Sequence, residues 1–462
     1  MDEAAADAET SRQHKLLNGP LRQTVLLLAM PVFAEQFLSF CVGFYDTFLA
    51  GHLAPDVSTP ATAAVGVAAY VGWLASMLFS MVGAGTTALV ARARGAGEME
   101  EANRIANRSV AMSLVAGLLF VAIILPTAPL FARVLRLEGL AAEITVRYLR
   151  IDAIGMLFTS VGLVGAAALR GCGNMQMPFW IHGTINVLNV LVSTALVYGF
   201  GPIPRLGVDG IVLGTVVART SGGLLMLAVL ARGVSGLQLL AHEFHLRGET
   251  VRRILRVGIP AAADGAIMWS GHFLFLRIIG SLGEAAFAAH IVGIRVEAIT
   301  YLPAVAWGAA AATLIGQSLG AHDVDRARSA GREAVLQCGL LGLGITLIFL
   351  FGAQQIYGLM HNDPAVRAAG IPAFRLAACF QIPLIVAIVF VSGLRGAGDT
   401  RYPMFITAIS TFGIRLPLAY LCGVVLDGGL FGAWIGMCAD MLVRGTLVAA
   451  RFLSGKWTTI RV

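Results

Sequence analysis

Charged residues are scarce in this chain of 462 residues. Asp, Glu, Lys and Arg together make up 13% of it, against 57% for hydrophobic residues, whereas a soluble globular domain carries about 25% charged residues. So few charges do not cover the surface of a soluble domain. The composition therefore excludes an ordinary cytosolic enzyme, a disordered chain and a small disulfide scaffold, and it indicates a membrane protein.

Lysine is nearly absent, since Lys15 and Lys456 are the only lysines among the 33 basic residues. The arginines are scattered singly through short segments, without a basic face or a patch interleaved with aromatic residues. The net charge of +7 therefore does not indicate nucleic-acid binding. We interpret the excess of basic residues as a determinant of membrane orientation, because basic residues hold loops on the cytoplasmic side of a membrane.

Cysteine is also sparse, and the six cysteines show no CxxC pair or other ligand spacing. We therefore expect neither a metal site nor a disulfide framework. Residues 1–21 lack the basic-then-apolar order of a cleaved signal peptide. They are interpreted as a cytoplasmic N-terminal tail.

Apolar runs are abundant, and each is long enough for a membrane-spanning helix of about 20 residues. A lipid-exposed backbone must satisfy its own hydrogen bonds, which favours α-helices over irregular segments. The predicted fold class is an all-α membrane protein with twelve transmembrane helices. The spans that carry Pro31, Pro126, Pro260, Pro303, Pro383 and Pro417 are candidates for bending, with ordinary tolerated prolines as the alternative. The spans are expected near residues 22–50, 63–90, 107–128, 147–168, 179–200, 207–231, 253–280, 285–315, 333–353, 372–393, 402–425 and 428–450.

The distribution of basic residues predicts the orientation. An even number of spans places both termini on one side, and the segments on that side hold 21 of the Lys and Arg residues, against five in the opposite segments and seven within spans. Because basic residues favour the cytoplasmic side, we expect both termini in the cytoplasm and a multi-pass protein of the cell inner (plasma) membrane.

The chain repeats itself at an offset of 225 positions. Residues 89–96 align with residues 314–321, and Leu169-Arg170-Gly171 aligns with Leu394-Arg395-Gly396. Six spans fall in each half, so two six-helix lobes with the same orientation are predicted, related by a pseudo-twofold axis. The expected organisation is a tail (1–21), an N-lobe (22–231), a cytoplasmic linker (232–252), a C-lobe (253–450) and a cytoplasmic C-terminal tail (451–462).

Two lobes of this kind favour a transporter, since rocking of repeats about a site between them is how many carriers alternate access. A duplicated channel or a membrane-embedded enzyme stays an alternative at this point. A prenyl or acyl transferase would need an Asp-rich metal motif or a catalytic His/Asp pair, which we do not find in the sequence. We also find no P-loop motif, which argues against direct use of ATP.

The repeated motifs resemble a known family. The order of Pro31, Asp46-Thr47, the segment 89–97, and the paired Leu-Arg-Gly motifs followed by Pro178 and Pro403 is similar to that of the multidrug and toxic compound extrusion (MATE) family of the MOP superfamily. The resemblance implies a transporter, not an enzyme, that exports organic, often cationic, drugs or toxic metabolites in exchange for H⁺ or Na⁺. It implies no cofactor, contact with membrane lipid and small-molecule substrates, and a monomer is expected.

A related alternative is a lipid-linked or polysaccharide flippase of the same superfamily. Such proteins often have additional spans and a more cationic central cavity. Twelve spans with few internal arginines favour the drug exporter.

Asp46 is the leading candidate for ion coupling. An ionisable group inside a span is costly unless it has a partner or a function, and burial favours the neutral form of a carboxylic acid, so a buried Asp can load and release a proton. Its carboxylate with neutral oxygens is also suited to Na⁺. Asp46 matches the first-helix aspartate of the family, and its counterpart in the second half is Phe275. The alternative is an Asp bonded to nearby backbone or hydroxyl groups.

Four more residues complete the predicted coupling site. Glu35 lies on nearly the same helical face as Asp46 and is a candidate for proton relay or cation binding, or alternatively extends to the inner surface. The resemblance implies an asparagine at Asn189, whereas Ser193 stands where one branch of the family has a second aspartate. Thr215 offers a further oxygen ligand. With a single formal charge among the oxygens of Asp46, Asn189, Ser193 and Thr215, H⁺ is favoured over Na⁺ as coupling ion.

The second half suggests a substrate cavity. Met268 stands where the NorM-type branch has a glutamate, and Asp264 is expected to pair with an arginine of another helix or to serve as a secondary site. Tyr45, Tyr301 and Trp307 are candidates for cation–π contacts with an aromatic cation, with ordinary packing as the alternative.

Overall fold

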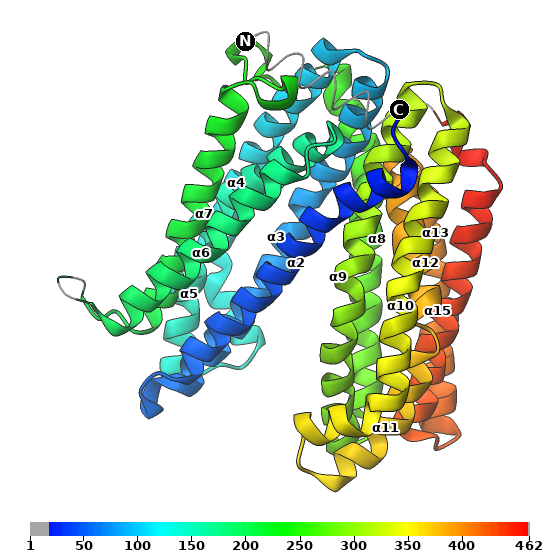
Figure 1. The fold of residues 1–462 in the computed structure, drawn as a ribbon. Helices are drawn as coiled ribbons and strands as arrows, with labels where there is room; N and C mark the ends of the chain where they lie inside the picture. Colours follow the sequence, from blue (N-terminus) through cyan, green and yellow to red (C-terminus); the bar gives the residue numbers. More distant parts are fainter. Residues whose placement is uncertain (1–17, 201, 203, 247, 461–462) are drawn as a thin grey trace. The chain divides into compact units, whose positions relative to one another are not determined.

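The computed structural model describes residues 18–200, 202, 204–246 and 248–460. The part of the N-terminal tail that precedes residue 18 therefore lies outside the described residues. Helices make up nearly all of this described part, which contains no β-strand (Figure 1). The first six long helices are α2 (Leu21–Gly51), α3 (Pro55–Gly95), α4 (Met99–Val134), α5 (Gly139–Gly171), α6 (Gln176–Tyr198) and α7 (Val208–Ala231).

The second half also has six helical segments among the described residues. Two of them are interrupted: α11 and α12 meet at a bend of 54°, and α13 continues into α14 through the π-helical turns η3 and η4. The bounds are α8 (Glu249–Gly280), α9 (Glu284–Gly320), α10 (Val324–Met360), α11 (Pro364–Ala378), α12 (Gln381–Gly396), α13 (Arg401–Ser410), η3 (Thr411–Arg415), α14 (Leu416–Tyr420), η4 (Leu421–Val425) and α15 (Gly429–Leu453).

The predicted all-helical membrane fold is confirmed. Within the described residues, ten helices are long and apolar enough to cross a membrane, or eleven when the bent pair α11–α12 counts as one span. The remaining predicted span corresponds to α8, which is 32 residues long but less apolar because it carries many small residues together with Asp264 and His272. The helices generally extend past the predicted spans at both ends.

Of the prolines considered for bending, Pro383 and Pro417 lie beside irregular helix geometry, whereas the other four lie inside continuous helices, namely Pro31, Pro126, Pro260 and Pro303. Proline lacks the N–H that would bond to the carbonyl four residues earlier, so Pro383 leaves the carbonyl of Cys379 without a helical partner. Residues Cys379 and Phe380 form the break between α11 and α12. Pro417 lies between the two π-helical turns, which are a frequent sign of a functional or strained segment.

Contacts divide the described residues into two compact units, which are considered separately. Unit 1 comprises residues 34–258, and unit 2 comprises residues 18–33 and 259–460. The first turns of α2 belong to unit 2, where Phe33 packs edge-on against Trp307 at 6.4 Å and Gln337 Nε2 donates to the carbonyl of Arg22 at 2.8 Å. The lobe boundaries drawn from the sequence repeat stay a prediction.

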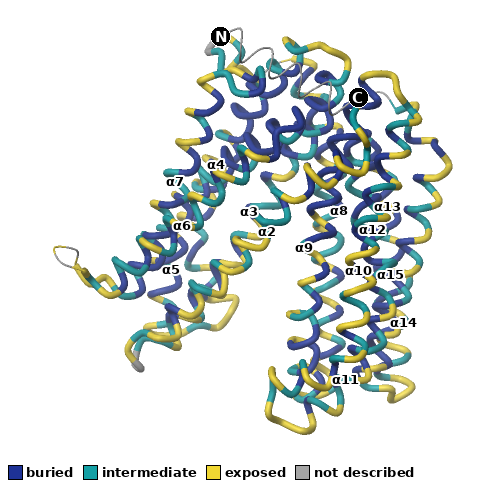
Figure 2. The backbone as a smooth tube through the Cα atoms, viewed as in Figure 1, coloured by how far each residue is buried: buried dark blue, intermediate teal, exposed yellow. Residues whose placement is uncertain are grey.

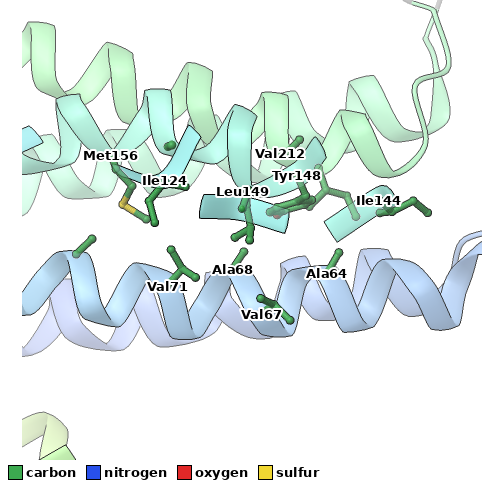
Figure 3. Packing of buried hydrophobic residues seen from close by; sticks show 14 of the residues in the cluster. Ala64, Val67, Ala68, Val71, Ile124, Ile144, Tyr148, Leu149, Met156 and Val212 are labelled. Carbon is green, nitrogen blue, oxygen red and sulfur yellow. The ribbon is translucent and has the colours of Figure 1, made fainter. Parts of the chain in front are cut away.

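Each unit has its own apolar core. In unit 1, residues of α3 such as Ala64 and Val71 face Tyr148 and Leu149 of α5 (Figure 3). In unit 2, buried aromatic side chains such as Trp434 take the corresponding role. Exposed residues recur along the helices between buried ones (Figure 2), as expected for helices whose outer faces contact lipid.

Candidate functional site

Asp46 lies in the second half of α2, within unit 1. The residue is half-buried, and its Oδ1 atom is buried without a hydrogen-bond partner among the described residues. Next to it, Tyr45 Oη lies 2.5 Å from Thr194 Oγ1 on α6. The hydroxyl of Thr194 donates to the carbonyl of Val190, so Tyr45 is the donor to Thr194. This bond ties the α2 segment around Asp46 to α6.

The polar residues predicted on α6 and α7 do come together. Asn189 Nδ2 donates to Thr215 Oγ1 at 3.0 Å, and Thr215 in turn donates to the carbonyl of Ile211 at 3.0 Å. Ser193 donates to the same carbonyl over 3.4 Å. The Oδ1 atom of Asn189 is buried and has no hydrogen-bond partner among the described residues, so it is an oxygen available to a cation.

A glycine makes this close approach of α6 and α7 possible. A Cβ atom placed on Gly214 would lie 2.2 Å from Ser193 Oγ and 2.6 Å from its Cα, so a larger residue would force the helices apart. The hydrogen bonds of the described residues join Asn189, Ser193 and Thr215 through the α6–α7 contact. None of these bonds connects them to Asp46.

A charged pair that was not predicted from the sequence joins α7 to α5 in unit 1. Arg219 of α7 donates from Nη1 to Asp152 Oδ1 of α5 at 2.6 Å, with the Asp152 side chain 5% exposed. Both residues act electrostatically on Asp46. Each of the two residues could have been identified from the sequence as a charged residue inside a predicted span. Neither residue belongs to a motif that identifies the family.

Glu35 is ion-paired within unit 1. Both of its oxygens accept from Arg170 Nη2, at 2.6 and 2.8 Å, and His182 Nε2 lies 3.9 Å from Oε1. The residue is only 4% exposed. Arg170 belongs to the Leu-Arg-Gly motif at the end of α5, so the motif arginine is the partner of the first-helix carboxylate.

The same ion pair recurs in unit 2. Asp264 of α8 is 2% exposed and accepts a hydrogen bond from Arg395, the arginine of the second Leu-Arg-Gly motif. The expected pairing of Asp264 with an arginine of another helix is therefore confirmed. Asp264 lies 229 positions after Glu35, the same offset that relates the two early prolines, Pro31 and Pro260.

A buried charge cluster in unit 2 occupies the region equivalent to Asp46. Asp440 of α15 accepts from Arg415 at 2.5 Å and from Arg444 at 2.6 Å, and none of the three side chains is more than 9% exposed. The guanidinium of Arg415 lies 5.9 Å from the ring centre of Phe275. Phe275 is the sequence counterpart of Asp46, so an aromatic ring stands where unit 1 has the acid.

The remaining predicted cavity residues all belong to unit 2. Met268 is half-buried on α8, and Tyr301 of α9 is 37% exposed. Trp307 is 2% exposed, and its indole nitrogen donates to Gln337 Oε1 at 2.9 Å, which is typical of a packing residue. Their predicted roles in substrate binding stay hypotheses.

Together, the helical fold and the polar residues inside its spans define a polytopic membrane transporter. The model of the MatE family matches residues 31–194 and 260–421, so the chain belongs to the MATE family. This confirms the resemblance found in the motifs. Members of this family are transporters and not enzymes.

Individual relatives agree with this assignment. The chain is 30% identical over 446 residues to "Probable multidrug resistance protein NorM" of Thermotoga maritima, covering 95% of this chain and 93% of the relative. It is 28% identical to "Multidrug resistance protein MdtK" of Edwardsiella ictaluri, over 93% and 94% of the two chains. A solved structure described as the "Outward-facing conformation of a multidrug resistance MATE family transporter of the MOP superfamily" shares the fold, with a TM-score of 0.87 and 22% identity over 96% and 98% of the chains.

Proposed function

We propose that this transporter is a secondary antiporter that exports organic, often cationic, compounds in exchange for H⁺, by alternating access of two lobes. The observation that carries the proposal is Asp46, a carboxylate inside a membrane-spanning helix with a buried oxygen that lacks a partner among the described residues. An ionised carboxylate in such a place is unstable by several kcal/mol unless a cation or proton neutralises it. Binding and release of that cation is the chemistry that coupling requires.

The oxygens predicted to complete the coupling site support H⁺ as the coupling ion. Sodium is a hard cation that is best held by several oxygens with adequate negative charge. Asn189 and Thr215 use part of their polar capacity on each other, and Ser193 is neutral. A proton needs only the single carboxylate of Asp46.

The names of the relatives support the choice of substrate. The proteins of Thermotoga maritima and Edwardsiella ictaluri are both named for multidrug resistance. An organic cation would be attracted by the carboxylate of Asp46 once its proton is lost, and Tyr45 beside it offers an aromatic face for cation–π contact. Proton and substrate would then compete for one charged region, which is the simplest form of exchange.

The orientation is part of the proposal. The excess of basic residues on one side supports cytoplasmic termini and insertion in the cell inner (plasma) membrane. In this orientation the proton enters from outside while the substrate leaves the cytoplasm. A monomer suffices, because the proposed coupling residues lie within a single chain.

The test is transport by the purified full-length protein in proteoliposomes. Efflux of a fluorescent organic cation, such as ethidium, is measured under an imposed pH gradient without Na⁺ and, separately, under a Na⁺ gradient at equal pH. We expect efflux to follow the pH gradient. A strict requirement for Na⁺ would reverse the choice of coupling ion, and absence of drug transport under either gradient would favour another cargo, such as a lipid-linked sugar.

A further inference from the structure

The Asp152–Arg219 pair places a guanidinium group within electrostatic reach of the proposed coupling residue. Asp152 on α5 is 4% exposed, and Arg219 on α7 reaches it with one guanidinium nitrogen at 2.6 Å. The stem of Arg219 runs across α5 at Gly155, where a Cβ atom would lie 3.4 Å from Arg219 Cδ. The arginine is thus held against α5 by packing as well as by charge.

The charges of Asp46, Asp152 and Arg219 sum to zero only while Asp46 is protonated. Asp152 and Arg219 cancel each other, so the cluster is neutral while Asp46 carries a proton. When Asp46 loses the proton, two carboxylates face one guanidinium. A guanidinium has five N–H donors and can bond to two carboxylates, so Arg219 is able to neutralise both in turn.

The groups acting on Asp46 are few. Tyr45, the neighbour of Asp46, packs against the apolar cluster that contains Tyr148 of α5 and Val212 of α7, the two helices that carry the pair. Arg219 and Asp152 are the charged residues whose influence reaches Asp46. Tyr148 lies in the apolar contact between α3 and α5 (Figure 3), and such a buried phenol is neutral. The hydroxyl groups of Tyr45 and Thr194 bond to one another. Beyond its burial, the ionisation of Asp46 therefore depends on the charges of the Asp152–Arg219 pair.

In unit 2, the arginine equivalent to Arg219 has a different partner and no equivalent of Asp46. At the offset of 225, Arg219 corresponds to Arg444, which pairs with Asp440 one turn earlier on its own helix at 2.6 Å. That acid also holds Arg415, and Phe275 stands in place of Asp46. The arginine of unit 2 is locked within a local cluster, whereas that of unit 1 is held by a different helix beside an acid that has no hydrogen-bonded partner among the described residues at Oδ1.

We propose that Arg219 is the resident counter-cation of Asp46 and that Asp152 is its holding partner. Arg219 stays on Asp152 while Asp46 is loaded, and it stabilises the ionised Asp46 after the proton leaves and before the substrate arrives. It competes with the incoming cation and so sets the proton affinity of the site. In this role it is a positioning residue. The inference deepens the proposed function, on which it rests for the identity of Asp46 as the coupling residue.

The test compares two single substitutions that act in opposite directions. Arg219→Gln removes a positive charge and leaves Asp152 unpaired, so Asp46 holds its proton to higher pH. Asp152→Asn frees Arg219 for Asp46, so the proton leaves at lower pH. We expect the pH midpoint of the Asp46 titration to move by about one pH unit or more in each variant, which is a tenfold change in proton affinity. A purely structural role would give no shift, or shifts in the same direction.

The readout is an infrared pH titration of the purified full-length protein, following the carbonyl band of protonated carboxylic acids. The band that disappears in Asp46→Asn belongs to Asp46. Arg219→Lys, which keeps the charge, should titrate close to wild type and provides a variant expected to fold. Arg147→Gln is the matched control, because Arg147 pairs with Asp209 between the same two helices at 2.9 Å but is 48% exposed.

The possible results separate this inference from the proposed function. Opposite shifts of the Asp46 band support the counter-cation role, even if transport does not follow the pH gradient. Unchanged midpoints in both variants, shifts of one sign, or an Asp46 that does not titrate would overturn it. Proton-driven efflux that persists in Asp46→Asn would instead overturn the proposed coupling residue, whatever the titration shows.

Discussion

The two units share one ion pair and differ at the position of the proposed coupling acid. Glu35–Arg170 in unit 1 and Asp264–Arg395 in unit 2 both join the first helix of a half to its Leu-Arg-Gly motif. Asp46, by contrast, has Phe275 as its counterpart. A pair present in both halves is best explained by helix packing. Asp46 is present in one half only and has a buried oxygen without a hydrogen-bond partner among the described residues, which is best explained by function. The repeat thus separates structural charges from the candidate for coupling.

The largest expected effect on stability is in the charge cluster of unit 2. Asp440→Asn leaves Arg415 and Arg444, each at most 9% exposed, without their carboxylate. Removing one member of a buried ion pair costs about 3–5 kcal/mol, so the purified protein should unfold at markedly lower temperature or denaturant concentration. A variant as stable as wild type would mean that this cluster is not structural.

The repeated ion pairs should respond alike but more weakly. Glu35→Gln and Asp264→Asn each remove the carboxylate of a pair whose arginine is partly exposed, at 21% and 32%. Solvent lowers the cost of the unpaired arginine, so each should lose about 1–2 kcal/mol of unfolding free energy. Equal losses with retained proton coupling would support the structural role. Loss of coupling in Glu35→Gln alone would make Glu35 part of the proton path.

The smallest effect on proton coupling is expected where an acid is added to unit 2, although loss of the buried Phe275 ring, 1% exposed, lowers stability. Phe275→Asp introduces the missing counterpart of Asp46 beside Arg415, whose guanidinium lies 5.9 Å from the native ring. The new carboxylate should pair with that arginine and stay ionised, leaving the number of protons exchanged per substrate unchanged. A second proton exchanged per cycle, measured from the reversal potential in proteoliposomes, would show that unit 2 also supports coupling.

The sequence was sufficient to predict the helical membrane fold, because its information lies in long apolar runs. It was less informative about helix ends. The segment predicted at 63–90 is α3 from Pro55 to Gly95, since a helix continues beyond the apolar core wherever its backbone bonds are satisfied internally. The segment predicted at 372–393 is broken at Cys379 and Phe380, where the proline at 383 removes a donor.

The candidate site was only partly predictable for a similar reason. Asp46 stands out as an acid in an apolar run, and the family resemblance added Asn189 to the site, with Thr215 as a further oxygen ligand. The pairing of Asp152 with Arg219, 67 positions apart, depends on how α5 packs against α7. A single sequence does not specify which helices are neighbours, so both residues were recognisable as charged and buried but not as partners.

The most direct test of the central claim is efflux by Asp46→Asn in proteoliposomes under an imposed pH gradient. The amide keeps the size of the side chain but cannot release a proton, so we expect proton-driven efflux to fall to the level of empty liposomes. Asp209→Asn, which alters an exposed acid paired with Arg147, serves as the control and should transport normally. Efflux by Asp46→Asn at the wild-type rate would contradict the assignment of coupling to Asp46.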